Sequence, residues 1–232
     1  MKKLLLMLMG VSMLSVGCAI NRNSDYATST RQVSGFSGID VGQGIKVNVV
    51  IGDADNVVVT ASADYIDDIK TEVKNGTLVI HWDKKRNIRM PQKVEVDVTA
   101  ISIVRVVASS GATVTTDTLT GDNLVFAASS GARINAMAKA NKVTAESSSG
   151  SSVMLAGKAQ NVDFDASSGA SISGDKLTAA NGKAEASSGA SVSVSANVNL
   201  EAEASSGGRV RYSGNPTMVN VSSSSGGSIS RL

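Results

Sequence analysis

The sequence predicts an all-β protein, a parallel β-helix (β-solenoid) whose coils have about 19 residues. A Ser-Ser-Gly tripeptide occurs seven times, and the glycines of successive copies lie 18 to 20 residues apart. Around each copy apolar and polar side chains alternate, which is typical of an extended chain with one buried face. Such coils bury that face only by stacking on one another. The copies are Ser109-Ser110-Gly111, Ser129-Ser130-Gly131, Ser148-Ser149-Gly150, Ser167-Ser168-Gly169, Ser187-Ser188-Gly189, Ser205-Ser206-Gly207 and Ser224-Ser225-Gly226.

Residues 1–17 have the features of a lipoprotein signal peptide. Two lysines precede an apolar run that ends at Val16, and Cys18, the only cysteine, follows closely. A basic start, a short apolar run and a small residue are typical of a secretory signal. Residues 14–18 (Leu-Ser-Val-Gly-Cys) resemble a lipobox, which implies cleavage before Cys18 and a diacylglycerol thioether on its sulfur. The alternative is an ordinary signal peptide in which this cysteine has no role.

Residues 18–33 are expected to be a lipidated N-terminus and a tether, because they are polar and aperiodic. Residues 34–232 are then a single β-solenoid domain, with an irregular β-rich front (34–100) before seven regular repeats (101–232). In the front, Asn75-Gly76 predicts a tight hairpin turn. A helical turn is expected over 64–68, and strands are expected over 45–49, 57–61, 69–73, 78–82 and 94–98.

Alternation through the tripeptide predicts that its second serine points into a narrow core of Val, Ile, Leu and Ala. Stacked hydroxyls could then hydrogen-bond along the axis, since each both donates and accepts. Glycine is expected at a corner of the coil. A catalytic serine would instead need a positioned base, and the only histidine, His81, lies in the front half. We therefore expect no catalytic residues, no enzymatic activity and no cofactor.

The charge balance argues against a nucleic-acid partner. Removal of residues 1–17 leaves 20 basic and 20 acidic residues, whereas nucleic-acid binders have a marked basic excess.

Two charged groups are candidate contact sites. One acid stands four residues before the glycine in each of four repeats, so stacking predicts an acidic column of Glu146, Asp165, Glu185 and Glu203. The column is either an ordinary solvated face or a row of calcium sites, although calcium wants six to eight oxygens from several directions. A basic cluster could contact anionic membrane lipids or polysaccharide, or be a solvated loop. It comprises Lys84, Lys85, Arg86 and Arg89.

The front of the chain resembles a known family. Residues 36–41 (Phe-Ser-Gly-Ile-Asp-Val), residues 44–49 (Gly-Ile-Lys-Val-Asn-Val) and the hairpin over 75–80 look like the "putative auto-transporter adhesin, head GIN domain" family. The tandem Ser-Gly coils also fit, so the resemblance covers about residues 36–230. It implies a right-handed β-helix in a secreted or lipid-anchored envelope protein, and it brings no catalytic residues.

Together these features predict a lipoprotein that crosses the inner membrane and is anchored in the bacterial outer membrane through Cys18, facing the periplasm or the cell surface. Its expected role is non-catalytic, adhesin-like binding of a polysaccharide or protein ligand on the solenoid surface. The alternatives are a structural envelope protein that assembles through its solenoid ends and a polysaccharide-acting β-helix enzyme.

Overall fold

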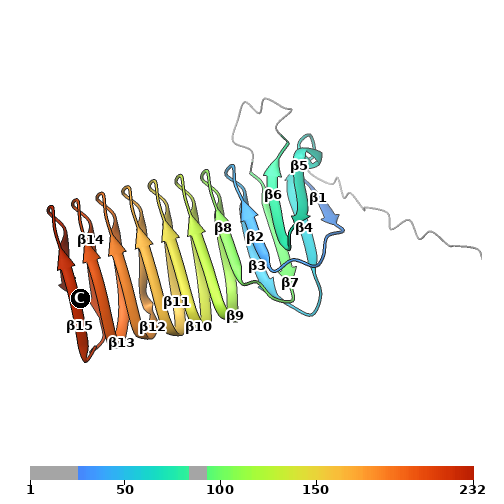
Figure 1. The fold of residues 1–232 in the computed structure, drawn as a ribbon. Coiled ribbons are helices and arrows are strands. Elements are labelled where there is room, and N and C mark those ends of the chain that lie inside the picture. Colours follow the sequence, from blue (N-terminus) through green and yellow to red (C-terminus); the bar gives the residue numbers. More distant parts are fainter. Residues whose placement is uncertain (1–25, 84–92) are drawn as a thin grey trace, which may run out of the picture.

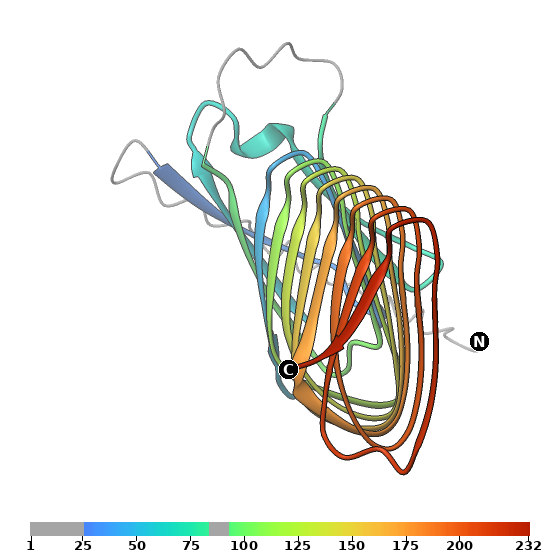
Figure 2. The ribbon, with the colours of Figure 1, turned by 90° about the vertical axis from the view of Figure 1, so that its left-hand side faces the viewer.

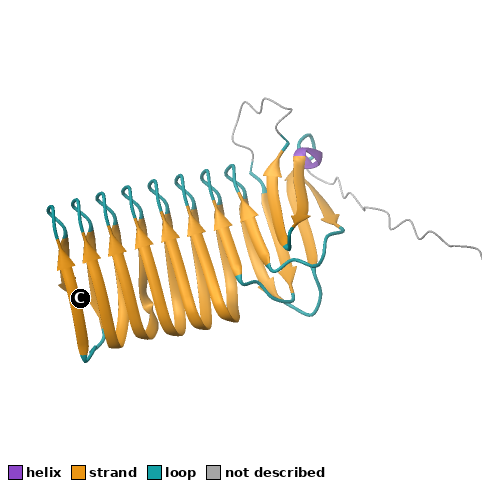
Figure 3. Cartoon of the chain, in the orientation of Figure 1, coloured by secondary structure: helices purple, strands orange, loops and turns teal. Residues whose placement is uncertain are grey.

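The computed structural model describes residues 26–83 and 93–232, whose strands form one long β-solenoid (Figures 1 and 3). All sixteen strands belong to a single sheet, and the only helical element in these residues is the 3₁₀ turn η1 (Ile66–Asp68). The all-β solenoid prediction is confirmed. The strands are β1 (Tyr26–Arg31), β2 (Gly38–Val41), β3 (Lys46–Ile51), β4 (Asn56–Ser62), β5 (Ile69–Lys74), β6 (Thr77–Trp82), β7 (Glu95–Ala100), β8 (Arg105–Ala108), β9 (Thr113–Ala128), β10 (Arg133–Ser147), β11 (Ser152–Ala166), β12 (Ser171–Ala186), β13 (Ser191–Ala204), β14 (Arg209–Ser213), β15 (Met218–Ser223) and β16 (Ser228–Arg231).

Each of the long strands β9 to β13 makes most of one coil. The strand leaves one tripeptide along the first wall, bends at the far edge and returns along the second wall to the next tripeptide (Figure 2). Neighbouring coils pair in parallel, for example from Arg133 opposite Ser152 to Ser147 opposite Ala166 in β10 and β11. Equivalent residues of successive coils therefore lie side by side, about 4.8 Å apart.

The tripeptides form tight turns along one edge of the solenoid, which corrects the expected position of the second serine. In the first copy the amide of Ala112 donates to the carbonyl of Ser109 at 3.0 Å. Ser110 and Gly111 between them have φ angles of 50° and 75°, and positive φ at both central residues matches a type I′ turn. The second serine is exposed at the turn apex in all seven copies. The expected core position of this serine was wrong because alternation stops at a turn.

A backbone ladder stands where the hydroxyl ladder was expected. The amide of Gly111 donates at 3.0 Å to the carbonyl of Ser130 in the next coil. The glycines of the five following copies make the same bond at 3.1 Å to the second serine of their own next coil. The ladder therefore links seven turns through backbone atoms alone. Glycine adopts the second positive φ of each turn without strain, because it has no Cβ.

The ladder extends into the front of the chain. The amide of Gly44 donates to the carbonyl of Ser110 at 3.0 Å, and Gln43 and Gly44 have φ angles of 60° and 74°. Residues 42–44 (Gly-Gln-Gly) are therefore a further copy of the turn, one without serine. They join β2 to β3, which together form the first coil.

The interior is narrow and tightly filled, as the alternation of residues predicts. The exception is the second serine of each tripeptide, which lies outside it. Phe126 and Phe164 are fully buried, and small alanines line the space beside most of the turns. The most polar copy has buried serines at two of these alanine positions, Ser147 and Ser151. Their hydroxyls lie 2.9 Å apart, and that of Ser151 donates to the carbonyl of Ala128 at 2.8 Å. Both hydroxyls therefore have partners, as burial requires.

Antiparallel strands close the N-terminal end of the solenoid. The strands β6 and β7 stack in parallel on β2 and β3, and then β5 pairs antiparallel with β6 while β4 and β1 follow β7. The expected front strands and hairpin are confirmed, with Asn75 and Gly76 at φ angles of 50° and 73°. Residues 26–31 of the expected tether form β1, because Ala27 and Ser29 are small enough to be buried against β4.

Candidate functional site

Parallel stacking arranges the outward side chains of the solenoid in straight columns. On the second wall, β10 to β13 keep one register from the far edge to the turn, so each outward position forms its own column. Columns that are two residues apart along a strand lie about 7 Å apart. The candidate sites are these columns and the grooves between them.

The predicted acidic column is assembled as expected. Glu146 pairs with Asp165, Asp165 with Glu185, and Glu185 with Glu203 in successive strands. Lys183 neutralises part of this charge, because its ammonium lies 2.7 Å from the Glu185 carboxylate.

The centre of the acidic column is electrostatically strained. Desolvation by the surrounding strands raises the pKa of Asp165 above its ordinary value, and the negative charges of Glu185 and Glu146 raise it further. Neighbouring carboxylates that share one face disfavour each other's ionised forms.

No group of three or more acidic, histidine or cysteine side chains within residues 26–83 and 93–232 has a geometry that could hold a metal ion. The expected solvated face of the acidic column and its alternative, a row of calcium sites, both stay predictions from the sequence. Calorimetric titration with calcium distinguishes them, and the absence of heat would contradict the calcium sites.

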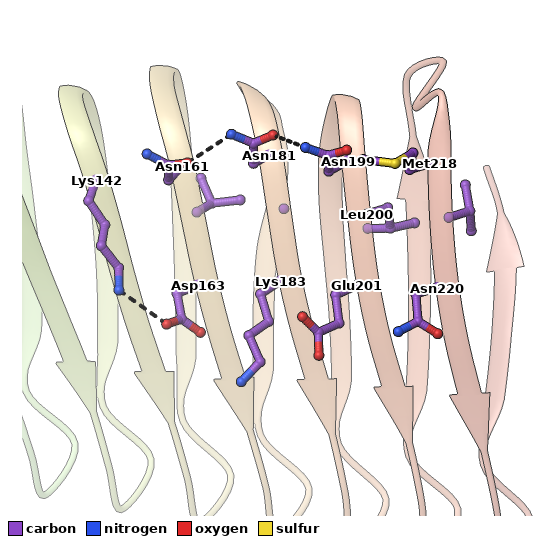
Figure 4. Close-up of a pocket in the computed structure, with 13 residues that line it drawn as sticks. Lys142, Asn161, Asp163, Asn181, Lys183, Asn199, Leu200, Glu201, Met218 and Asn220 are labelled. Carbon is purple, nitrogen blue, oxygen red and sulfur yellow. Dashed lines mark hydrogen bonds and ion pairs between the residues drawn. The ribbon is translucent and has the colours of Figure 1, made fainter.

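A groove of about 590 Å³ crosses the second wall over the last coils, and we call it the asparagine groove (Figure 4). An asparagine column borders one side, and a charged column borders the other. Inward-pointing positions form the floor, and at Gly182 a Cβ would come within 3.1 Å of Val194 and Ala196 on the first wall. The asparagine column is Asn161, Asn181 and Asn199, and the charged column is Asp163, Lys183 and Glu201.

Side-chain amides are hydrogen-bonded along the asparagine column. Asn181 donates from Nδ2 to Oδ1 of Asn161 at 2.9 Å, and Asn199 donates likewise to Asn181 at 2.7 Å. Lys142, one coil before Asn161, reaches across the groove to the carboxylate of Asp163 at 3.3 Å. The groove thus has hydrogen-bonded polar side chains along its borders and an apolar floor that includes Val162 and Leu200.

Sequence reasoning missed the asparagine column, although the sequence contains its signal. Each of these asparagines stands eight residues before a tripeptide glycine, as does Asn123 in an earlier repeat. Outward polar residues are common in any solenoid, so the spacing gained meaning only when the register placed the three amides in contact.

A second groove lies on the first wall and is more apolar. It has a volume of about 630 Å³, and its most exposed apolar side chains are Met137 and Met154, at 48% and 46%. The parallel register shifts beside it, between Asn135 and Met137 and between Met154 and Ala156. These irregularities interrupt the alternation, so the sequence pattern could not place this groove.

The histidine is not placed to activate a tripeptide serine. His81 lies on β6 in the N-terminal cap, and its Nδ1 is 2.9 Å from the carbonyl oxygen of Trp82. The serines of the tripeptides occupy the turn edge of the coils that follow the cap.

Other predicted site residues lie outside the described part of the chain. These are Cys18 and the basic cluster Lys84, Lys85, Arg86 and Arg89. Within the described part, no helix is long and apolar enough to cross a membrane.

Comparison with known proteins gives a family match and a set of similar folds. Residues 35–216 match the family model described as "Putative auto-transporter adhesin, head GIN domain". Among curated proteins, none matches the chain.

Three solved structures share the fold along most of both chains. A "putative adhesin" from Bacteroides fragilis is 20% identical, with a TM-score of 0.80 over 89% of this chain and 97% of that one. A "putative adhesin" from Parabacteroides distasonis is 18% identical, with a TM-score of 0.73 over 90% and 98%. A "putative lipid binding protein" from the same species is 15% identical, with a TM-score of 0.67 over 90% and 98%. At these identities the likeness shows the fold alone.

The strained acidic column predicts how stability changes with pH. Because the folded state raises the pKa of Asp165, it holds this proton more tightly than the unfolded state does. The stability that protonated Asp165 contributes should therefore be lost as the pH rises from the unfolded pKa, near 3.8, through the folded one. The substitution Asp165→Asn should raise the urea midpoint at pH 7, and the gain should vanish below the unfolded pKa.

Asp53→Asn, an exposed change in the front half, is the control and should show no such gain. An equal effect of Asp165→Asn at both pH values would contradict the electrostatic explanation.

Proposed function

The chain belongs to the family described as "Putative auto-transporter adhesin, head GIN domain", and from this premise we propose that it is a non-catalytic, adhesin-like binding module of the cell envelope. The observation that carries the proposal is the in-register stacking of β9 to β13. It provides two long walls, each with a groove, and the outward side chains of the second wall repeat at strand spacing. Surfaces of this kind suit extended ligands that make many small contacts.

A lipid anchor at Cys18 is the second part of the proposal, with the outer membrane as its expected location. The signal-like residues 1–17 and the lipobox-like residues 14–18 support it. The strand β1, which follows the segment with Cys18, belongs to the cap at the N-terminal end of the solenoid (Figure 1). An anchor there would leave the coils and both grooves to extend away from the lipid.

Assembly through the solenoid ends is a second candidate function, favoured by the exposure of β15 beside β13. Every residue of β15 is exposed, including Val219 and Val221 at 46% and 48%, although equivalent positions in earlier coils are buried. An open edge of this kind can pair with another strand. Light scattering of the full chain over a range of concentrations tests the idea, and a strict monomer throughout would exclude it.

The anchor predicts that Cys18→Ser moves the protein from the membrane fraction to the soluble fraction, because serine cannot form the thioether. Cell fractionation followed by immunoblotting measures this, and circular dichroism verifies that the variant is folded. An unchanged membrane fraction would contradict lipidation.

Binding is tested with beads that carry the full chain, applied to immobilised glycans, extracellular proteins and bacterial cell surfaces. We expect saturable adhesion to at least one class, and no adhesion to any of them would contradict the binding role.

A further inference from the structure

The asparagine groove presents hydrogen-bonding groups that its own ladder does not use. A side-chain amide has two N–H donors and two lone pairs on its oxygen. In the ladder, Asn181 spends one donor on Asn161 and one lone pair on Asn199. Since a ladder of parallel amides uses the N–H opposite the C=O, the remaining N–H and lone pair lie together on one edge. That edge can donate to one ligand atom and accept from its neighbour.

The end of the ladder has an unmet acceptor. Oδ1 of Asn199 is buried and receives no hydrogen bond from the described residues, which is an energetic cost. The next position in the column is Met218, whose side chain lies beside Asn199 and is 64% exposed (Figure 4). Methionine is flexible, so this side chain can turn away and admit a hydroxyl donor.

The charges around the groove are balanced. Lys142 and Lys183 oppose Asp163 and Glu201, so the groove has no net charge to attract a polyanion or a polycation. Carboxylates accept hydrogen bonds and ammonium groups donate them, so both columns can bind hydroxyl groups. No aromatic side chain lines the groove among the described residues, so recognition depends on hydrogen bonds rather than on ring stacking.

We propose that the asparagine groove binds a neutral, linear, β-1,4-linked glycan whose sugars have free vicinal hydroxyl pairs. Two adjacent hydroxyls match the free amide edge, because one can donate to Oδ1 while the other accepts from Nδ2. The inference rests on the proposed binding function and specifies its ligand class.

The repeat of the groove matches such a chain. The rungs are spaced by about 4.8 Å along the solenoid axis, a length similar to the advance of one β-1,4-linked hexose. Consecutive sugars of a β-1,4-linked glycan are rotated by about half a turn about the glycan axis. The vicinal hydroxyl pairs of successive sugars therefore face the asparagine column and the charged column alternately. The volume of about 590 Å³ falls within the ordinary range for ligand sites of about 300–1,000 Å³.

Chain length is the first readout. Each hydrogen bond contributes little net free energy, so affinity should accumulate as successive sugars occupy successive rungs. Calorimetry on the full chain, in a detergent without a sugar headgroup, should show affinity rising by about tenfold or more from cellobiose to cellohexaose. Chitohexaose, in which an acetamido group replaces one hydroxyl of each pair, should bind about tenfold more weakly. Equal affinity for the two hexamers, or no binding of cellohexaose, would overturn the proposal.

Substitutions locate the binding. Asn181→Leu removes the central amide and should weaken cellohexaose binding by about tenfold. The matched control is Asn123→Leu, in the same column but two coils before Asn161 and outside the groove, and it should have no effect. If Asn181→Leu fails to fold, Glu201→Ala tests the opposite, exposed column and should weaken binding with an unchanged melting curve. Unchanged binding in the folded groove variant would overturn the proposed location.

Failure of this inference is distinguishable from failure of the proposed function. Beads that adhere to proteins or cells while cellohexaose does not bind would refute the glycan assignment and leave the binding role intact. Beads that adhere to nothing would refute the binding role itself.

Discussion

The structure depends on a two-residue turn that repeats in register. Each turn needs positive φ at both central positions, and its glycine amide donates to the carbonyl of the next turn's second serine. This hydrogen bond places the turn of each coil directly beside the equivalent turn of the next coil. Once the turns are stacked, the parallel strands beside them start in one register. The second wall keeps this register, so its outward side chains form columns, whereas the register shifts along the first wall, for example between Asn135 and Met137. Fold and candidate sites therefore have the same cause.

The columns explain how a chain with few unusual residues acquires distinctive surfaces. A single asparagine is ordinary on an exposed strand. Three asparagines at equivalent positions of successive coils form a continuous ladder of hydrogen-bonded amides with a free edge. In the acidic column, desolvation and then the repulsion of the neighbouring carboxylates raise the pKa of Asp165. A glycine at position 182 accommodates Val194 and Ala196 from the opposite wall. Stacking thus converts the composition of each coil into a property of the whole wall.

The sequence was sufficient for the solenoid and for the acidic column, because both depend on the repeat period and on the alternation of inward and outward residues. The family was recognised from motifs of the front half, such as residues 36–41, together with the tandem coils. It was misleading at the second serine, since alternation does not pass through a turn in which two residues have positive φ. It concealed the turn at Gln43 and Gly44 because that copy has no serine. The strand β1 was hidden by its polar composition, although Ala27 and Ser29 are buried. The asparagine column could be recognised only once the residue-by-residue pairing of neighbouring coils was known. The repeat period varies from 18 to 20 residues, so it does not determine this pairing.

Residue-resolved hydrogen exchange of the folded chain tests the stacked turns most directly. The amides of Gly131, Gly150 and Gly169 belong to exposed turns, where an unbonded N–H would exchange rapidly. If each donates to the next coil, these amides should be protected nearly as strongly as those of the strands, because all of them open only when coils separate. Exchange at the rate of an unstructured peptide would contradict the ladder, and with it the register that builds both walls.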